Sequence, residues 1–349
     1  MKAPNYYGIS LKTLSLGMNE SMFSLTLRFS DSADYRKFIF ETRLLPSRNT
    51  FFSRVMHSTA RIYVWRHRTL REITLVSQGN LSDILFDLRQ TIDPRKLILL
   101  DFSVQSAHTF FATTFLNALH TCIKTSRLCF EKTDDPEAFH DFRLAIRAFT
   151  SLLQIARKTG VKGLDTLTKN ARFLAKSSNE LRDTDVRIGL YAEFKHEIPA
   201  SLIKYRETLL MNARASLHAE SAQTWLTALR FIAAYPAHAK EEVHFLKYLT
   251  DQTKKVAKRW HKLDLKDDAK VHALRIRMKR LTYGYTTLKD KESDILETAK
   301  SIKAIQSRLG DIRDLRSFFI LPGLDPETRY QAVQKLSSLE DEVKDMKIK

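Results

Sequence analysis

The chain has 349 residues, which is enough for two domains or one large helical domain. Hydrophobic residues make up 43% of it, and only 9 Gly and 8 Pro occur, which favours a core built from long helices. The formal net charge of +18 indicates a polyanionic partner, such as a nucleic acid, an anionic membrane surface or a phosphate polymer. No apolar run reaches the roughly 18 residues of a membrane-spanning helix, so we predict no membrane span and no membrane partner.

Residues 1–104 predict a small α+β domain. The apolar residues of 23–29 alternate with polar ones, which is typical of a half-buried strand. A short helix through about Thr42 is expected next. The remaining predicted elements are strands at 61–68 and 71–77, a helix at 81–90 and a strand at 96–104. The order β-α-β-β-α-β matches a ferredoxin-like unit.

From about residue 105 the apolar residues recur with a helical period. The predicted helices are 105–131, 134–158, 164–178, one opening near Asp183, 200–219, 222–234, 241–262, 268–288, 292–309, 312–320 and 327–345. Gly160 and Gly163 break the pattern, Gly310 is predicted to form a turn, and Pro199 and Pro236 separate other helices. We therefore expect a helical domain at 105–325 and a polar C-terminal helix within 326–349.

Two of the predicted helices carry the same cationic stripe. Each stripe has a His, an Arg three residues on, and a cation four residues further. The residues are His140, Arg143 and Arg147 in the first helix, and His272, Arg275 and Lys279 in the second, 132 residues later. Because each residue turns an α-helix by about 100°, each set falls within roughly 60° on one face. Tyr283 returns to the face of the second stripe and can add a hydroxyl donor.

The same two helices carry an apolar seam that predicts a core-facing side. The seams are Phe142, Ile146, Phe149 and Leu153 in the first helix, and Leu274, Met278, Leu281 and Tyr285 in the second. Each cationic stripe lies at the flank of its seam, about 100° round the helix. A row of cations at the margin of a core costs desolvation energy unless an anion lies nearby. The stripes therefore predict an anion-binding site.

A second block of residues repeats at nearly the same offset. Lys169, Arg172, Arg182 and Asp183 recur as Lys300, Lys303, Arg313 and Asp314, each shifted by 131 positions. This predicts a tandem duplication of a helical unit, with repeats at about 105–219 and 220–325. We expect the repeats to be related by an approximate two-fold, with their stripes facing a shared space.

The cysteine count indicates reduced thiols. Cys122 and Cys129 lie seven residues apart in a helical pattern, about 10 Å along the axis, which is too far for a disulfide. Two buried thiols fit a cytoplasmic protein. No Cys and His spacing typical of zinc occurs, and we predict no metal and no cofactor.

These motifs together resemble the CHAD domain (conserved histidine α-helical domain) over roughly residues 105–322. The family's motifs are represented here by His140-x-x-Arg143-x-x-x-Arg147, Arg182-Asp183-x-Asp185-Val186, His272-x-x-Arg275-x-x-x-Lys279-Arg280-x-x-Tyr283 and Gln306-x-x-Leu309-Gly310-x-x-x-Asp314. Three positions depart from the family pattern: Ala148 and Thr282 stand where Arg is common, and Asn179 where Gly is frequent. We expect the departures to weaken anion affinity at two points and to leave both stripes in place.

The resemblance implies two four-helix-like halves with a basic channel between them. It also implies binding of inorganic polyphosphate and association with polyphosphate granules. Some members carry an N-terminal triphosphate tunnel metalloenzyme domain of the CYTH type, but its Glu-x-Glu-x-Lys signature is absent from this chain.

We therefore predict a non-catalytic, polyphosphate-binding protein. The predicted binding residues are His140, Arg143, Arg147, Lys169, Arg172, Lys176, His272, Arg275, Lys279, Arg280, Tyr283, Lys300 and Lys303. The Arg-Asp pairs at 182–183 and 313–314 are interpreted as helix caps and inter-helix ion pairs rather than ligands. Bound polyanion should favour protonated histidines, so binding should be tighter at mildly acidic pH.

Other functions remain possible from the sequence. Nucleic-acid binding fits the charge, but the stripes lack interleaved aromatic residues for base stacking. His140-Asp141 resembles part of an HD phosphohydrolase site, yet the second stripe has Ala273 in place of the Asp. A purely structural scaffold would need the cations neutralised internally, and 40 acidic residues face 58 Lys and Arg.

Overall fold

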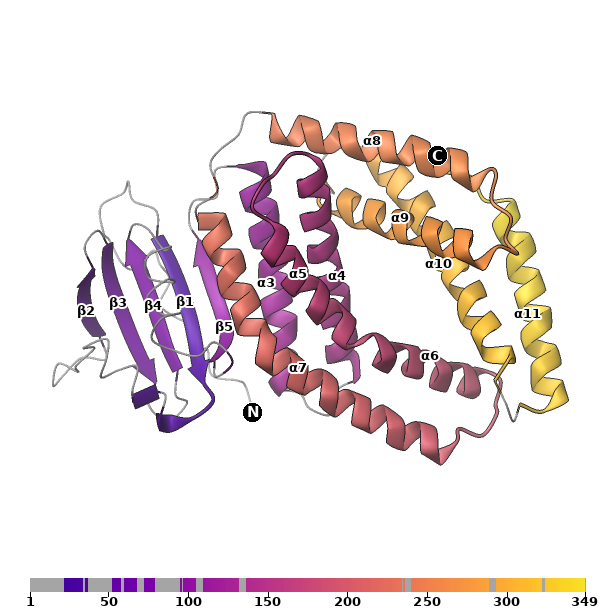
Figure 1. Cartoon of the computed structure of the whole chain (residues 1–349), viewed down its shortest axis with the longest axis horizontal. Coiled ribbons are helices and arrows are strands. Elements are labelled where there is room, and N and C mark those ends of the chain that lie inside the picture. The colour runs from indigo at the N-terminus through magenta and orange to yellow at the C-terminus, as the bar shows by residue number, and fades with distance from the viewer. Residues whose placement is uncertain are drawn as a thin grey trace.

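The computed structural model describes residues 22–33, 35–36, 52–57, 60–67, 72–78, 95, 97–104, 109–131, 136–233, 235, 240–288, 293–321 and 324–348. Within these ranges the chain is mainly helical, with one β-sheet near its N-terminus. Figure 1 places the sheet at one end of the molecule and the C-terminal helix at the other.

The sheet has five strands. They are β1 (Met22–Phe29), β2 (Phe52–His57), β3 (Ala60–His67), β4 (Glu72–Gln78) and β5 (Leu97–Val104), in the order β2-β3-β4-β1-β5. Every neighbouring pair is antiparallel, with Leu25 of β1 opposite Leu75 of β4 and Phe102 of β5. The strands predicted near 23–29, 61–68, 71–77 and 96–104 are confirmed, whereas the predicted helix at 81–90 lies outside the described residues.

The ferredoxin-like topology is not confirmed, because the sheet contains β2 as a fifth strand at its edge. The apolar residues of β2 are Phe52, Val55 and Met56, which do not keep the two-residue period of a strand. Its strand conformation follows from pairing with β3, from Phe52 opposite Trp65 to His57 opposite Ala60. A pattern within the segment could not predict that pairing.

The sheet joins the helices through β5, which contacts α3 (Phe110–Glu131) and α7 (Ala200–Ala233). Leu27 and Phe29 of β1 and Leu97 and Leu99 of β5 are buried in the same apolar cluster as the helical residues. Burial of that apolar area holds the sheet against the helices.

The remaining helices follow in chain order. They are α4 (Pro136–Lys158), α5 (Asp165–Ser177), α6 (Asn179–Glu193), α8 (Glu241–Trp260), α9 (Asp268–Thr286), α10 (Ser293–Phe319) and α11 (Pro326–Lys344). Most predicted boundaries lie within a few residues of these, and α6 begins at Asn179, ahead of the predicted start near Asp183. No helix of the described part of the chain is long and apolar enough to span a bilayer.

Two predicted breaks are wrong. Helix α7 runs without interruption from Ala200 to Ala233, where we expected separate helices at 200–219 and 222–234. The sequence between them contains neither Gly nor Pro, and Ser221 and Ala222 are small and buried, so the helix continues through them.

Helix α10 also continues through Gly310, where a turn was predicted. A Cβ atom at Gly310 would lie 2.8 Å from Nη2 of Arg275 and 3.2 Å from its Nε. The glycine therefore gives the Arg275 side chain of α9 room against the backbone of α10. Its role is close approach rather than a change of direction.

The two stripe helices, α4 and α9, pack against each other. All eight seam residues are buried, which confirms the predicted core-facing sides. Gly284 permits the close approach of α9, because a Cβ there would lie 2.6 Å from Leu249 Cδ2 and 2.9 Å from Ile155 Cδ1. Cys122 and Cys129 are buried, and the described structure contains no disulfide between them, as predicted.

A second, smaller apolar cluster joins the ends of α6, α10 and α11. It contains Tyr191, Phe318, Leu324 and Ala332. Polar contacts reinforce this junction: Arg316 of α10 bonds Glu340 of α11 at 2.6 Å. Helix α11 thus braces the far end of the helical part, which Figure 1 shows opposite the sheet.

Candidate anion-binding site

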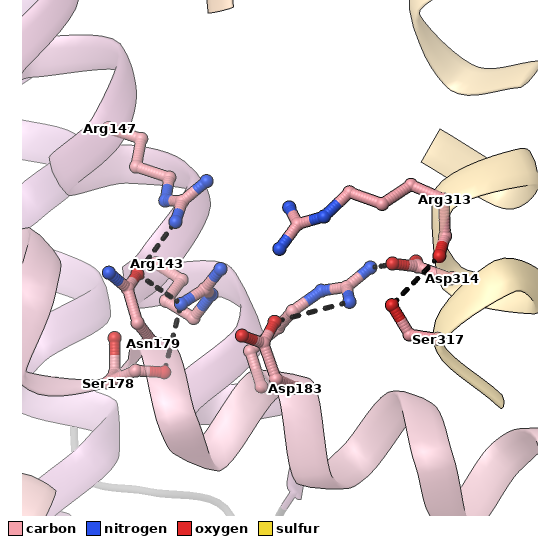
Figure 2. Close-up of polar contacts among 9 residues, drawn as sticks. Arg143, Arg147, Ser178, Asn179, Asp183, Arg313, Asp314 and Ser317 are labelled. Atoms are coloured by element: carbon pink, nitrogen blue, oxygen red, sulfur yellow. Dashed lines mark hydrogen bonds and ion pairs between the residues drawn. The ribbon is translucent and has the colours of Figure 1, made fainter. Parts of the chain in front are cut away.

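The first stripe places two guanidinium groups one helical turn apart on α4. Arg143 is only 8% exposed, and its Nη1 donates to the backbone oxygen of Ser178 at 2.9 Å and to Oδ1 of Asn179 at 3.2 Å. Arg147 is half-buried, and its Nη2 donates to the same Asn179 oxygen at 2.7 Å. Figure 2 shows both arginines meeting the junction of α5 and α6.

That junction is a single non-helical residue. Ser178 ends α5 and precedes α6, with φ of −109° and ψ of 11°. Its carbonyl oxygen accepts the backbone N–H of Arg182 at 3.2 Å as well as the Arg143 side chain. The kink therefore exposes a backbone acceptor to α4 and places Asn179 at the first position of α6, beside both guanidinium groups.

The second stripe brings Arg275 and Lys279 of α9 to the same space. Arg275 lies against Gly310, and its Nε is buried without a hydrogen-bond partner. Burial is the largest cause of a lowered pKa at Arg275, and the carboxylate of Asp314 opposes it. A buried donor without a partner is costly, and a ligand oxygen would satisfy it.

Lys279 is the most perturbed amine of the site. Burial, followed by four neighbouring guanidinium groups, lowers its pKa from 10.5 to about 7. Those groups are Arg275, Arg147, Arg182 and Arg143. Since cations from both stripes act on this one amine, the structure brings the two stripes together around it.

An ion pair connects α6 with α10. Arg182 Nη2 lies 3.0 Å from Asp314 Oδ2, and Arg182 Nη1 lies 3.7 Å from Asp183 Oδ1. The interpretation of Arg182 as an inter-helix ion-pair residue is confirmed. Within the described residues, Arg313 has no carboxylate partner, and Figure 2 shows its side chain extending toward Arg147 on the opposite helix.

We call this group of residues the cation cluster. It comprises Arg143 and Arg147 of α4, Arg182 of α6, Arg275 and Lys279 of α9, and Arg313 of α10. The carboxylates among their strongest electrostatic partners are Asp183 and Asp314. In the part of the chain that the structure describes, six cations therefore face two carboxylates at one place.

Tyr283 adds a neutral donor to the cluster. Burial raises the pKa of its phenol, against the opposing effect of Arg147, Arg143 and Arg275. The phenol therefore keeps its proton at neutral pH and can donate a hydrogen bond. Its position confirms that it returns to the face of the second stripe.

The two predicted histidines occupy different surroundings. His272 is largely exposed next to the cluster. Partial desolvation of its ring, followed by the charges of Arg313, Arg275 and Lys279, lowers its pKa below the ordinary value of 6.5. His140 is exposed at the start of the first stripe. The structure therefore connects His272 to the cluster electrostatically, and it places His140 at the surface.

Other predicted residues lie apart from the buried cluster. Arg280 turns toward α4 and donates to Oε1 of Gln154 at 2.7 Å, so it ties the two stripe helices together. Five predicted cations are exposed on α5 and α10 and are not among the strongest charges acting on the cluster: Lys169, Arg172, Lys176, Lys300 and Lys303. Their contact with a ligand stays a prediction.

Sequence reasoning left two residues out of the site. Asn179 is a departure from the family pattern that was not among the predicted binding residues, yet it contacts both stripe arginines. Arg313 was interpreted as an ion-pair residue because it repeats Arg182, yet its guanidinium extends into the shared space. The repeat offset was the available signal, since it predicted that 182 and 313 occupy equivalent places.

The fold and the site define a mainly helical domain that gathers arginines and a lysine from four helices around one space. The sequence model of the CHAD domain matches residues 117–317, which is more than half of the chain. The chain belongs to the CHAD domain family. It is similar to the crystal structure of the CHAD domain from the plant Ricinus communis, with 20% identity, a TM-score of 0.47, and coverage of 67% of this chain and 85% of that one. No curated protein matches the chain.

Proposed function

We propose that this protein binds inorganic polyphosphate, or a similarly phosphate-rich polyanion, at the cation cluster and does not catalyse a reaction. The observation that carries the proposal is the excess of cations over carboxylates in a partly buried place. Gathered charges of one sign are unfavourable until an oppositely charged group joins them. CHAD domains are associated with polyphosphate binding in general, which supports the same ligand.

The chemistry of the donors favours phosphate. A guanidinium can donate two parallel hydrogen bonds to phosphate oxygens, and an ammonium adds a compact charge. The phenol of Tyr283 supplies a neutral donor beside them. A receptor for single-stranded nucleic acid would instead use aromatic faces for base stacking. The aromatic residue described here beside the cation cluster is Tyr283, and its side chain is half-buried.

The proposal divides the cations into two roles. Arg147, Lys279 and Arg313 are half-buried or exposed, so each can contact a ligand from a different helix. Arg182 is engaged by Asp314 and connects α6 to α10, which fixes the distance between ligand-binding helices. The pseudo-two-fold relation of the two repeats stays part of this proposal.

We also propose a cytoplasmic location and association with polyphosphate granules. Support for the location comes from Cys122 and Cys129, which are buried thiols not joined in a disulfide in the described structure. Unpaired cysteines are usual in reducing compartments.

The proposal is tested by titrating the protein with inorganic polyphosphate at two salt concentrations. Duplex DNA and RNA of matched total charge are titrated in parallel. A double variant, Arg147→Gln with Lys279→Gln, should weaken polyphosphate binding on the order of 100-fold and reduce the dependence of log Kd on log salt by about two charges.

The matched control is the double variant Lys254→Gln with Lys255→Gln. It makes the same change in net charge on the exposed face of α8 and should bind nearly as wild type does. Equal affinity for all three polymers, insensitive to the cluster variant, would mean a diffuse basic surface. Release of phosphate from polyphosphate upon addition of divalent metal would contradict the non-catalytic part of the proposal.

A further inference from the structure

We propose that Asn179 is a positioning residue of the cation cluster: its one side-chain oxygen orients Arg143 and Arg147 without neutralising either of them. The inference rests on the proposed function, because the orientation matters only if the arginines bind an anion. It assigns Asn179 a role in binding, where the sequence showed only a departure from the family pattern.

The geometry centres on one shared acceptor. Asn179 Oδ1 lies 2.7 Å from Arg147 Nη2 and 3.2 Å from Arg143 Nη1 (Figure 2). Two guanidinium groups one turn apart on the same helix repel each other. A partial negative charge placed between them lowers that repulsion and fixes both side chains in one orientation.

Most of the N–H donors of the two arginines are not used in the contacts with Ser178 and Asn179. A guanidinium has five N–H donors. Arg147 uses one of them on Asn179, and Arg143 uses two, on Ser178 and Asn179. These contacts therefore do not use Nε and Nη2 of Arg143, nor Nε and Nη1 of Arg147. Anchoring at one nitrogen orients the group, since the guanidinium is planar and rigid.

The neutrality of Asn179 distinguishes it from the other acceptors of the cluster. Arg182 is paired with two carboxylates, Asp314 at 3.0 Å and Asp183 at 3.7 Å. An aspartate at position 179 would accept the same hydrogen bonds and also cancel one positive charge. The chain therefore uses carboxylates for the bridge between helices and an amide for the stripe, where positive charge must stay available.

Backbone geometry supports the assignment. Asn179 is the first residue of α6, directly after the single non-helical residue Ser178. Its position is set by the helix that follows and by the Ser178 carbonyl, which itself accepts Arg143. The amide is half-buried, and its oxygen is held by the two arginines.

Three variants test the proposal: Asn179→Ala, Asn179→Asp, and the control Asn212→Asp. Asn212 is exposed on α7, so its replacement makes the same change in net charge away from the cluster. For each variant, the polyphosphate Kd is measured over a series of salt concentrations, together with the thermal melting temperature.

The two Asn179 variants should behave differently. Asn179→Ala leaves the charge unchanged, so Kd should rise roughly 10-fold at every salt concentration, with the salt slope unaltered. Asn179→Asp should weaken binding by at least about 10-fold, reduce the salt slope by about one, and raise the melting temperature because a carboxylate now neutralises one of the two charges. Asn212→Asp should leave Kd within about two-fold of wild type.

The outcomes separate this inference from the proposed function. If wild type binds polyphosphate and Asn179→Ala binds equally well or better, Asn179 does not position the arginines. If Asn179→Asp matches Asn212→Asp, the neutrality of the amide is irrelevant. If wild type does not bind polyphosphate, the proposed function fails as well.

Discussion

Replacing Lys279 with Gln should stabilise the protein and weaken polyphosphate binding at the same time. The pKa of Lys279 is about 7 in the folded chain, against an ordinary value of 10.5. Each pKa unit corresponds to about 1.4 kcal/mol, so the charged amine destabilises the fold by as much as about 4 kcal/mol at pH 7. Part of the side chain is exposed, and we expect a net gain of about 1–3 kcal/mol in the variant.

The sign of this effect depends on pH in a defined way. Below pH 7 the amine is charged in both folded and unfolded chains, and the destabilisation is fully present. Between pH 7 and about 10.5 the unfolded chain holds the extra proton, so the stability of wild type rises with pH and approaches that of the variant. Thermal melting at pH 6.5 and pH 9 measures this difference directly.

Polyphosphate affinity should fall as pH rises, whereas the stability of the free protein rises. A bound polyanion restores the charged amine, so polyphosphate binding takes up a proton above pH 7. The affinity of wild type should be greatest below about pH 7 and fall by as much as about 100-fold by pH 9. The Lys279→Gln variant should bind more weakly at pH 6.5 and lose most of this decline.

The control is Lys254→Gln, an exposed lysine of α8 that changes net charge equally. It should alter neither the melting temperature nor the pH dependence. A Lys279→Gln variant that melts lower than wild type and binds with the same pH profile would refute the argument, since the amine would then be stabilised by its surroundings.

Three further predictions concern other residues of the cluster. Arg313→Gln should weaken polyphosphate binding roughly 10-fold without lowering the melting temperature. Arg182→Gln should lower the melting temperature by several degrees, because the ion pair between α6 and α10 is lost. Equal effects of the two variants would contradict the division of roles. Gly310→Ala should leave the stability unchanged or raise it by up to about 1 kcal/mol, because α10 gains helix propensity, yet should weaken binding several-fold by displacing Arg275 in the same titration. His272→Gln should flatten the pH dependence of Kd below pH 6.5, because the pKa of the ring is lowered in the free protein and a bound polyanion raises it. An unchanged slope in that range would exclude the imidazole from binding.

The sequence alone determined the faces of the two stripe helices. Residue spacing fixes the angle of each side chain around its own helix axis, because every residue turns the helix by about 100°. The seams of α4 and α9 are therefore buried where predicted, and Arg143 and Arg147 lie at their margin. The family also followed from these motifs, since four of them occur in the expected order.

Spacing could not predict which neighbour lies opposite each face. Arg182 and Arg313 lie 131 residues apart at matching positions of the predicted repeat, yet Arg182 is paired with Asp314 and Arg313 extends toward Arg147. Lys169 and Lys300 were grouped with the stripes because of the same repeat, and both are exposed on other helices. The periodicity of residues within one helix carries no information about which residues of other helices lie nearby.

The roles of Gly310 and Asn179 became clear only from the tertiary structure. A glycine in a sequence is compatible with a turn or with close packing, and here the guanidinium of Arg275 occupies the space beside Gly310. An asparagine beside a helix start is compatible with a cap, and here its oxygen accepts from two arginines of α4. The physical reason is the same for both: burial, repulsion and unmet hydrogen bonds arise from groups far apart in the sequence, and they exist only once the helices have packed.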